Sequence, residues 1–190
     1  LQELADFAKE RVYLAIPHED EIIYVNSAYP KADIGLMRAI IGEHAKMHCT
    51  GLGKAMLAFL PAEQQQTYLS KPLQPYTEYT ITDKGRLQAE LEEIRRQGYA
   101  VDNMEHEFGI KCVAMPILGR NRQVAAAVSI SGPSLRFDEE KIEVLVRELR
   151  NKVKKLGLDK TCEEKLLKEC DKLYHMPFGS HEASVIRLYV

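Results

Sequence analysis

The sequence predicts an α+β domain in which helices pack on a mostly antiparallel sheet. Two β-rich runs, 12–16 and 21–25, are separated only by Pro-His-Glu-Asp, a polar turn of the kind that joins hairpin strands. Short strands also follow one another in the C-terminal half, and segments with helical spacing of apolar residues lie between the two groups. Parallel neighbours need much longer connections, so antiparallel pairing is expected.

The N-terminal elements follow from apolar spacing. Leu4, Phe7 and Ala8 share one helical face, so residues 1–10 are predicted to be the end of a helix. The hairpin comes next. Residues 36–41 are a candidate third strand, which Gly42 would end.

Two helices are predicted in the middle of the chain. Thr50 is a favourable N-cap for a helix that ends before Pro61. A short helix over 62–69 should follow, because Pro is favoured in a first helical turn. Residues 71–80 contain two prolines and are predicted to form a loop.

A long helix is predicted over 84–97, beginning at Thr82 or Asp83 and ending at Gly98. Its apolar residues Leu87, Leu91 and Ile94 share one face.

Three strands follow, at 99–102, 109–118 and 124–131. Residues 119–123 have the composition of a turn, and Asp138 is expected to cap an amphipathic helix over 139–156. We predict one domain over residues 1–157. Residues 158–190 differ in pattern and are predicted to be a C-terminal appendage of unknown role.

Composition argues against two classes of function. The net charge of −2 does not favour direct binding of nucleic acid, which usually requires a basic stripe. No run of about 18 apolar residues exists, so no membrane contact is expected. The four cysteines suggest no disulfide framework, and we expect a cytoplasmic protein. The chain begins with Leu1 and not Met, so we expect that an upstream segment has been removed.

The run Thr50-Gly51-Leu52-Gly53-Lys54 at a predicted helix start allows two interpretations. Free backbone N–H groups beside small residues can bind an anion. The commoner alternative is that the glycines only permit tight helix packing. A nucleotide-binding P-loop is excluded, because that motif needs Gly where this chain has His48, and Ser or Thr where it has Ala55.

The strand over 109–118 places Ile110, Cys112 and Ala114 on one side. A cysteine among small apolar residues is usually part of the core. Asp102 ends the preceding strand beside an acidic turn, where an isolated acid is most often exposed to solvent.

The strand over 124–131 has one ordinary core face and one unusual face. The core face is predicted to hold Val124, Ala126, Val128 and Ile130. The other face is small and hydroxylic, with Ala125, Ala127, Ser129 and Ser131. The two serines either bind a ligand carboxylate or carbonyl, or face solvent.

Other candidate sites are weaker. Cys112 with His106 is the alternative of a cysteine-dependent enzyme, but the two flank an acidic turn and no Gly-x-Ser-x-Gly motif occurs. The pair His44 and His48 is a similarly weak candidate for a metal site near the pocket. Zinc ligands with an unfavourable spacing occur in the appendage: Cys162, Cys170, His175 and His181. We predict no enzyme activity, no cofactor and no metal site.

Three runs carry a resemblance: GLGKAMLAFLP, GYAVDNMEHEFGIKCVAMPI and AAAVSISGPSLRF. In this order and spacing they resemble the effector-binding domain of IclR-family bacterial transcriptional regulators, over about residues 1–157. The middle run is the most specific and matches at Gly98, Asp102, Glu105, Cys112, Val113, Ala114 and Ile117. The family signature normally ends with an aromatic residue or His and then Asp or Asn. This chain has Leu118-Gly119 there, so the turn after the strand is expected to differ.

The resemblance implies a GAF/profilin-like fold and a sensor of a small metabolite, such as a carboxylate, keto acid or sugar acid. Polar contacts carried over by position are the backbone of Gly51 and Leu52, with Asp102, Cys112, Ser129 and Ser131. The apolar walls would be Ile34, Met37, Ala45 and Ile110. The resemblance also implies a homodimer or homotetramer that contacts DNA only through an absent N-terminal winged helix-turn-helix domain.

From these residues we hypothesise that the helix start at Gly51 and Leu52, with Ser129 and Ser131, holds a ligand carboxylate. Asp102 would accept a hydrogen bond from a ligand hydroxyl or hydrate, because a bare carboxylate facing it would be repelled. Ligand binding would then shift the balance between arrangements of two linked chains.

Overall fold

A six-stranded antiparallel sheet, in the order β3-β2-β1-β6-β5-β4, forms the centre of the molecule. The computed structural model describes residues 1–31, 40–119 and 122–156. The strands are β1 (Arg11–His18), β2 (Glu21–Ala28), β3 (His44–Lys46), β4 (Ala100–Asn103), β5 (Ile110–Leu118) and β6 (Val124–Pro133). The predicted α+β class with antiparallel pairing is confirmed.

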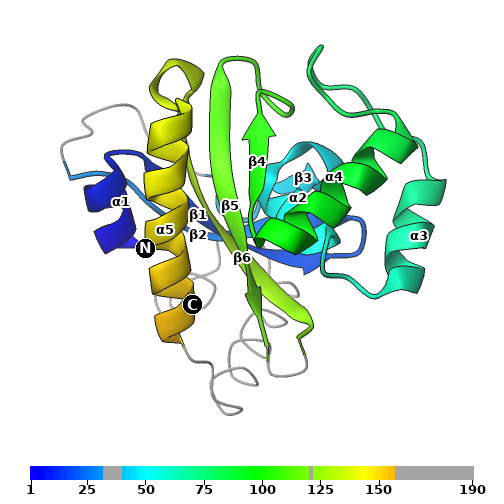
Figure 1. Cartoon of the computed structure of the whole chain (residues 1–190), viewed down its shortest axis with the longest axis horizontal. Helices are drawn as coiled ribbons and strands as arrows, with labels where there is room; N and C mark the ends of the chain where they lie inside the picture. Colours follow the sequence, from blue (N-terminus) through cyan, green and yellow to red (C-terminus); the bar gives the residue numbers. More distant parts are fainter. Residues whose placement is uncertain (32–39, 120–121, 157–190) are drawn as a thin grey trace.

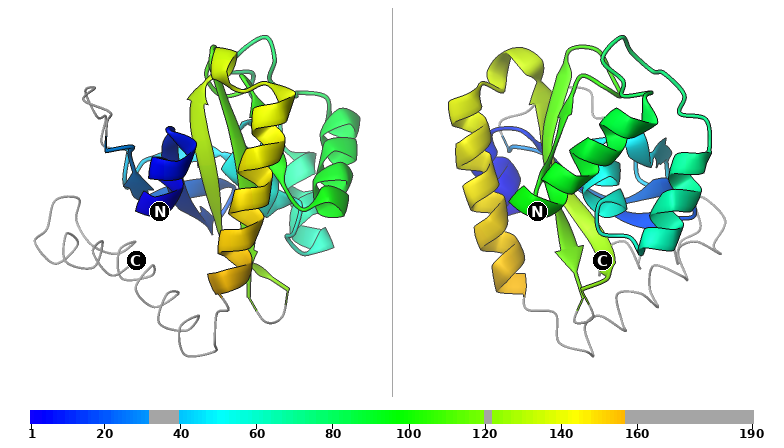
Figure 2. Two further views of the ribbon diagram at one scale, coloured as in Figure 1. Left: turned by 60° about the vertical axis from the view of Figure 1, so that its left-hand side comes forward. Right: turned by 45° about the vertical axis from the view of Figure 1, so that its right-hand side comes forward.

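Helices cover both faces of this sheet (Figures 1 and 2). One face carries α1 (Gln2–Ala8) and α5 (Glu139–Leu156), and the other carries α2 (Gly51–Leu57), α3 (Ala62–Ser70) and α4 (Lys84–Gln97). Each layer of helices buries its own apolar cluster against the sheet. Two short 3-10 turns complete the described part, η1 (Met47–Cys49) before α2 and η2 (Ser134–Arg136) before α5.

The helix ends follow the local chemistry that the sequence indicated. Thr50 Oγ1 accepts from Gly53 N–H at 3.0 Å, and Asp83 Oδ1 accepts from Arg86 N–H at 2.8 Å. Asp138 likewise accepts from the third residue after it, the N–H of Lys141. Gly98 ends α4 with φ 84°, a left-handed conformation that costs glycine little.

The prediction of a third strand over 36–41 is wrong where it can be checked. Residues 36–39 lie outside the described part, and Ile40 and Ile41 are not in a strand. Gly42, with φ 87°, donates its N–H to Tyr24 O in a turn, and the chain pairs with β2 only after that turn, as β3.

Val124 lies on the opposite face from the one predicted. The register of β6 against β5 shifts between Ile117, which pairs with Ala126, and Leu118, which pairs with Val124. Ala125 is thus the extra residue of a β-bulge, and a bulge reverses the alternation of side chains. Val124 consequently packs with the cluster under α2, while Ala126 packs with the cluster under α5.

Helix α2 lies unusually close to the sheet. A Cβ on Gly51 would come within 2.5 Å of Cys112 Sγ and 3.3 Å of Ala114 Cβ. Gly53 packs instead against the turn before the helix, where a Cβ would come within 2.3 Å of Met47 Cα in η1. The sheet surface beneath is correspondingly small, because Ala15, Ala100, Ala114 and Ala127 form it. The packing interpretation of the two glycines is therefore correct, whatever else the helix start does.

A buried ion pair fixes the underside of α2. Lys54 Nζ donates to Glu105 Oε1 at 2.6 Å and to Glu90 Oε1 at 3.0 Å, and its side chain is 1% exposed. Desolvation opposes the charged form of Lys54, but the two carboxylates outweigh it and raise the lysine pKa. The pair links α2 to α4 and to the β4–β5 loop, so it holds three segments in one arrangement.

Several predictions fall on residues that are not described. They are the pocket walls Ile34 and Met37, the appendage over 158–190, and its cysteines and histidines.

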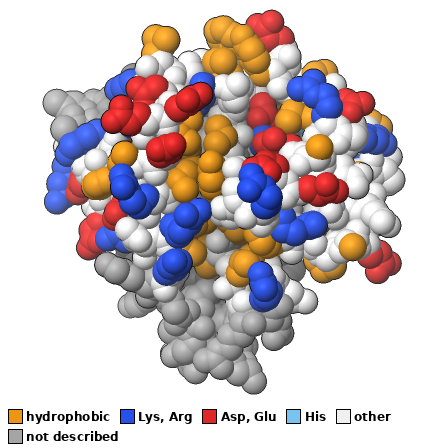
Figure 3. Space-filling model, viewed as in Figure 1, with side chains coloured by type: hydrophobic (Ala, Val, Ile, Leu, Met, Phe, Trp, Pro, Cys, Tyr) orange, Lys and Arg blue, Asp and Glu red, His pale blue; other side chains and the backbone are white. Residues whose placement is uncertain are grey.

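Among the described helices, none is long and apolar enough to cross a membrane. On the face shown in Figure 3, basic side chains lie mainly across the middle and lower part, and acidic side chains lie mainly above them and at the sides, with hydrophobic side chains between them.

The close approach of α2 generates a stability prediction. Gly53→Ala should lower the free energy of unfolding by about 2–3 kcal/mol, because the new methyl group meets the Met47 backbone, which cannot rotate away. Urea unfolding followed by circular dichroism measures this change. The matched control is Gly85→Ala in α4, whose Cβ would meet only Asp83 Oδ1 at 3.3 Å and which should cost nothing. Equal stability of the two variants would contradict the packing described.

Candidate functional site

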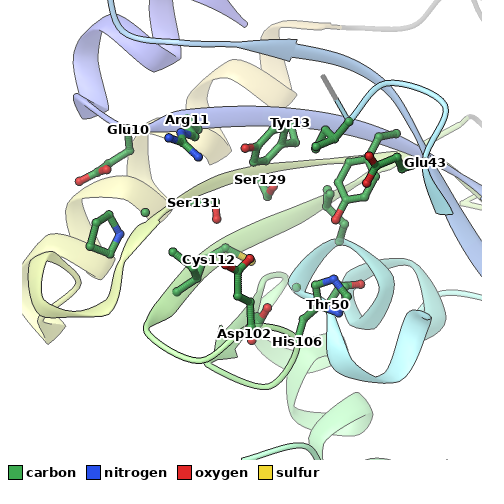
Figure 4. Close-up of a pocket in the computed structure, with 18 of the residues that line it drawn as sticks. Glu10, Arg11, Tyr13, Glu43, Thr50, Asp102, His106, Cys112, Ser129 and Ser131 are labelled. Carbon is green, nitrogen blue, oxygen red and sulfur yellow. The ribbon is translucent and has the colours of Figure 1, made fainter. Parts of the chain in front are cut away.

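A cavity of about 590 Å³ opens where α2 begins and the sheet face is left uncovered (Figure 4). Strands β1, β2, β5 and β6, the start of α2 and the loop after β4 all contribute to its wall. Its lining includes these polar residues: Tyr13, Tyr24, Thr50, Asp102, His106, Cys112, Ser129 and Ser131. The site is concave and holds a few convergent polar groups, which is typical of small-molecule pockets.

Most of the predicted contact residues that are described meet in this cavity. Its lining includes Gly51, Leu52, Asp102, Ile110, Cys112, Ser129 and Ser131. Ala45 is the exception. It is buried in the cluster under α2, while its neighbours Glu43 and His44 line the cavity.

Asp102 is a buried acid and not the exposed turn residue that its surroundings in sequence suggested. Only 5% of it is exposed, and its Oδ1 accepts from the Glu105 N–H at 2.7 Å. Burial raises the pKa of the Asp102 carboxyl to about 7, and the negative charge of Glu105 acts in the same direction. The hydrogen bond from Glu105 N–H lowers this pKa but does not outweigh the burial. Near neutral pH this carboxyl can therefore either donate or accept a proton at the cavity wall.

Cys112 lies between Asp102 and Ser131 on the cavity floor. Burial raises the pKa of its thiol, the charge of Asp102 adds to this, and a hydrogen bond from the Gly51 backbone opposes it. A thiol in these surroundings is a poor nucleophile, because the thiolate is the reactive form.

His106 contacts a different cysteine from the one predicted. Its Nδ1 lies 3.7 Å from Cys49 Sγ, and its ring lies 5.3 Å from that of Tyr76. Burial raises the pKa of Cys49 to about 12, so this thiol is not activated either. The geometry does not support a catalytic pair of Cys112 and His106.

Two tyrosines form the side of the cavity along β1 and β2. The rings of Tyr13 and Tyr24 meet edge to face with centroids 5.7 Å apart. Burial raises the pKa of Tyr13 to about 12 and raises that of Tyr24 as well, so both keep their hydroxyl protons. Each therefore offers a ligand one donor and an apolar ring face.

The end of the cavity at the start of β1 is built around a buried carboxylate. Glu10 is 3% exposed, and its two oxygens accept from Arg136 at 2.8 Å and from Lys141 at 2.7 Å. Gly132 fits against it, since a Cβ there would lie 2.2 Å from Glu10 Oε2. The ion cluster fixes the α1–β1 junction to η2 and α5.

Sequence reasoning missed the part of the site that β1 and β2 provide. Tyr13 and Arg11 reach the cavity because β1 pairs with β6, more than a hundred residues later, and no local pattern announces that pairing. The only available signal was that Arg11 and Tyr13 share a strand face with the small residue Ala15.

Histidines that could have held a metal have other partners: His44 contacts Glu21, and His48 contacts Tyr68. Within the described ranges, no group of three or more His, Cys, Asp or Glu side chains could hold a metal ion.

Comparison with known proteins identifies one family. The model for "Bacterial transcriptional regulator IclR C-terminal" matches residues 1–158. The HTH-type transcriptional regulator KdgR of Escherichia coli is 33% identical over 158 residues, which are 83% of this chain and 60% of that protein. The chain thus spans less than two thirds of this relative.

Solved structures agree with that result. IclR of Thermotoga maritima is similar with a TM-score of 0.76 and 36% identity, covering 86% of this chain and 64% of that one. The inducer-binding domain of a double mutant of the PobR transcription factor from Acinetobacter, in complex with 3-hydroxybenzoic acid, gives a TM-score of 0.74 at 25% identity. It covers 83% of this chain and 95% of that one.

The buried Asp102 carboxyl should make stability depend on pH. Its pKa is raised from 3.8 to about 7 in the folded state, so the acid destabilises the fold progressively as the pH rises through this window. Asp102→Asn removes this penalty, and its Oδ1 can still accept from Glu105 N–H. The variant should match the parent below about pH 4 and exceed its free energy of unfolding by up to about 4 kcal/mol above pH 7.

Urea unfolding at pH 4.5 and pH 8 measures the change. Glu78→Gln, at an exposed loop residue, controls for the loss of one negative charge. A difference between parent and Asp102→Asn that is the same at both pH values would contradict a carboxyl held neutral by burial.

Proposed function

This chain belongs to the IclR family of bacterial transcriptional regulators, as the C-terminal, ligand-binding part of one, and we propose that its cavity binds a small carboxylic acid that also carries a hydroxyl or keto oxygen. The cavity would serve as the effector site. Occupancy would control binding of DNA by a winged helix-turn-helix domain that lies outside this chain.

The observation that carries this proposal is the convergence of neutral hydrogen-bonding groups in one cavity. Ser129, Ser131, Cys112 and Asp102 come from the neighbouring strands β6, β5 and β4, and Thr50 lies at the start of α2 on the cavity wall. A polar cavity face of this kind would cost stability if it merely filled space, because buried polar groups need partners. A ligand with oxygen atoms at both ends supplies such partners.

The ligand class is supported by the chemistry of the wall and by one structural relative. Asp102 and the tyrosine and serine hydroxyls suit a ligand hydroxyl, carbonyl or carboxylate. The PobR domain was solved with 3-hydroxybenzoic acid, which combines a carboxyl and a hydroxyl on a rigid ring. Keto acids and sugar acids have the same pair of groups on shorter or more polar skeletons.

The route from the cavity to the rest of a regulator is proposed to run through β1. Lys9 and Glu10 line the cavity and directly follow α1, so a ligand contacts the segment that connects α1 to the sheet. A ligand that prefers one position of this junction shifts the balance between arrangements of two linked chains. We propose a homodimer or homotetramer in the cytoplasm, where a regulator of transcription acts.

We propose a sensor and not an enzyme. Both buried thiols have raised pKa values, and His106 is near Cys49 instead of Cys112. The curated relative KdgR and the solved relatives are transcriptional regulators by name.

Calorimetric titration with a panel of keto acids, sugar acids and hydroxybenzoates tests the assignment. For any acid that binds, Ser131→Ala should weaken binding about tenfold, the value of one hydrogen bond to a charged group. Asp102→Asn should weaken it similarly. Glu105 N–H occupies Oδ1, so the amide NH₂ would face the ligand and cannot accept from its hydroxyl. Ser70→Ala at the end of α3 is the control. If both cavity variants bind like the parent, the cavity is not the effector site.

A further inference from the structure

His48 is a buried histidine whose two ring nitrogens both have partners in other segments. It lies in η1, directly before α2, and only 2% of it is exposed. Its Nε2 lies 2.9 Å from the backbone oxygen of Gln74, in the loop over 71–83 that joins α3 to α4 (Figure 1). Its Nδ1 lies 3.0 Å from the hydroxyl oxygen of Tyr68 in α3. One imidazole therefore connects η1 to α3 and to the loop that follows α3.

These partners determine where the ring carries its hydrogen. A carbonyl oxygen can only accept, so Nε2 carries the hydrogen and donates it to Gln74 O. The Tyr68 oxygen accepts from the backbone N–H of His48 at 3.1 Å, so its own proton is available to Nδ1. When His48 is neutral in this form, each of the three hydrogen bonds has one donor and one acceptor.

A second proton on the ring removes this match. Nδ1–H would then face the Tyr68 oxygen, and the Tyr68 proton would lose its acceptor. A buried donor without an acceptor is costly. Burial also opposes the charged ring and lowers the pKa of His48, and the positive charge of Lys46 acts in the same direction. The hydrogen bond to Gln74 O opposes this shift without outweighing it.

The charges that act on His48 and Tyr68 are those of Lys46 and Asp20. Lys46 of β3 is bound to Glu21 of β2, and Asp20 of the β1–β2 turn is bound to Lys71 at the start of the loop. Each of these two carboxylates already has a cation, so neither is directed at the imidazole. The other titratable side chains around it are Tyr68, Tyr76 and Cys49, with His106 against the same Tyr76 ring.

Helix α3 depends on this contact more than α2 does. Tyr68 is the one buried residue of α3, whereas all seven residues of α2 are buried. The loop is hydrogen-bonded to η1 through Gln74 O, and to the β4–β5 loop through Thr80, whose Oγ1 donates to Glu105 O at 2.6 Å. Segments with few buried contacts open at the lowest free energy. Loss of the His48 contacts would therefore free α3 and the first part of the loop before it disturbed α2.

We propose that His48 is a pH-sensitive switch: its neutral ring holds α3 and the 71–83 loop on η1, and its protonation releases them while α2 and the sheet stay folded. The switch does not depend on which ligand the cavity binds.

The direction of the switch follows from proton linkage. The closed segment resists the proton that the open segment takes up, because the pKa of His48 is lowered from 6.5. The closed form is therefore fully stable above pH 6.5 and loses stability as the pH falls below that value. Asp102 acts in the opposite sense, since its raised pKa makes acid conditions stabilising. A loss of protection in acid cannot come from Asp102.

Nitrogen–proton correlation spectra of the histidine rings test the switch on the parent protein. At pH 7.5 His48 should be neutral with its hydrogen on Nε2. It should remain mostly neutral at pH 6, where an ordinary histidine is mostly protonated. A hydrogen on Nδ1 in the neutral ring, or a ring that is mostly doubly protonated at pH 6, would overturn the proposal.

Hydrogen exchange at pH 7.5 and pH 5.5, corrected for intrinsic rates and followed by mass spectrometry, tests the release. Opening within residues 62–83 should increase about three- to tenfold at pH 5.5, since one histidine with an open-state pKa near 6.5 allows about tenfold at most. Peptides of α2 should change by less than twofold.

Two variants identify the group responsible. His48→Gln cannot titrate and should lose the pH dependence of opening. His18→Gln, at a half-buried histidine of β1 whose ring lies against that of His44, should keep it. The same pH dependence in the parent and in His48→Gln, or an equal increase in α2, would show that His48 is not the switch. If His48→Gln does not fold, the ring spectra and the exchange of the parent still decide.

Discussion

The close contact between the start of α2 and the sheet is the constraint on which the site depends. Gly51 lets the helix backbone approach Cys112 and Ala114 of β5, and Gly53 lets it fold back on the Met47 backbone of η1, at distances that no side chain would permit. The Lys54–Glu105 pair then holds the helix from below. Helix α2 packs over the small residues Ala15, Ala100, Ala114 and Ala127 of the sheet. The adjoining residues Ser131, Cys112 and Asp102 line the cavity at the start of the helix.

The electrostatics of the cavity follow from which charges are neutralised within the protein. Lys54 and Glu10 are both buried, and each is paired with two partners of opposite charge. Buried charges without such partners are strongly destabilising, so these clusters serve the fold first.

Local chemistry predicted much of this fold, and long-range pairing decided the rest. Thr50, Asp83 and Gly98 marked helix ends correctly, because capping depends on neighbouring residues only. The face of Val124 was wrong because a bulge leaves no clear trace in a strand of small residues. Seven of the contact residues expected from the resemblance line the cavity. Arg11 and Tyr13 were not foreseen, since their place depends on the pairing of the first strand with the last.

The most direct test of the central claim is a crystal structure of this chain grown with an acid that calorimetry shows to bind. The account predicts electron density for that acid inside the cavity, in contact with Ser129, Ser131 and Asp102. An empty cavity with the acid bound elsewhere on the protein would contradict the assignment of the site.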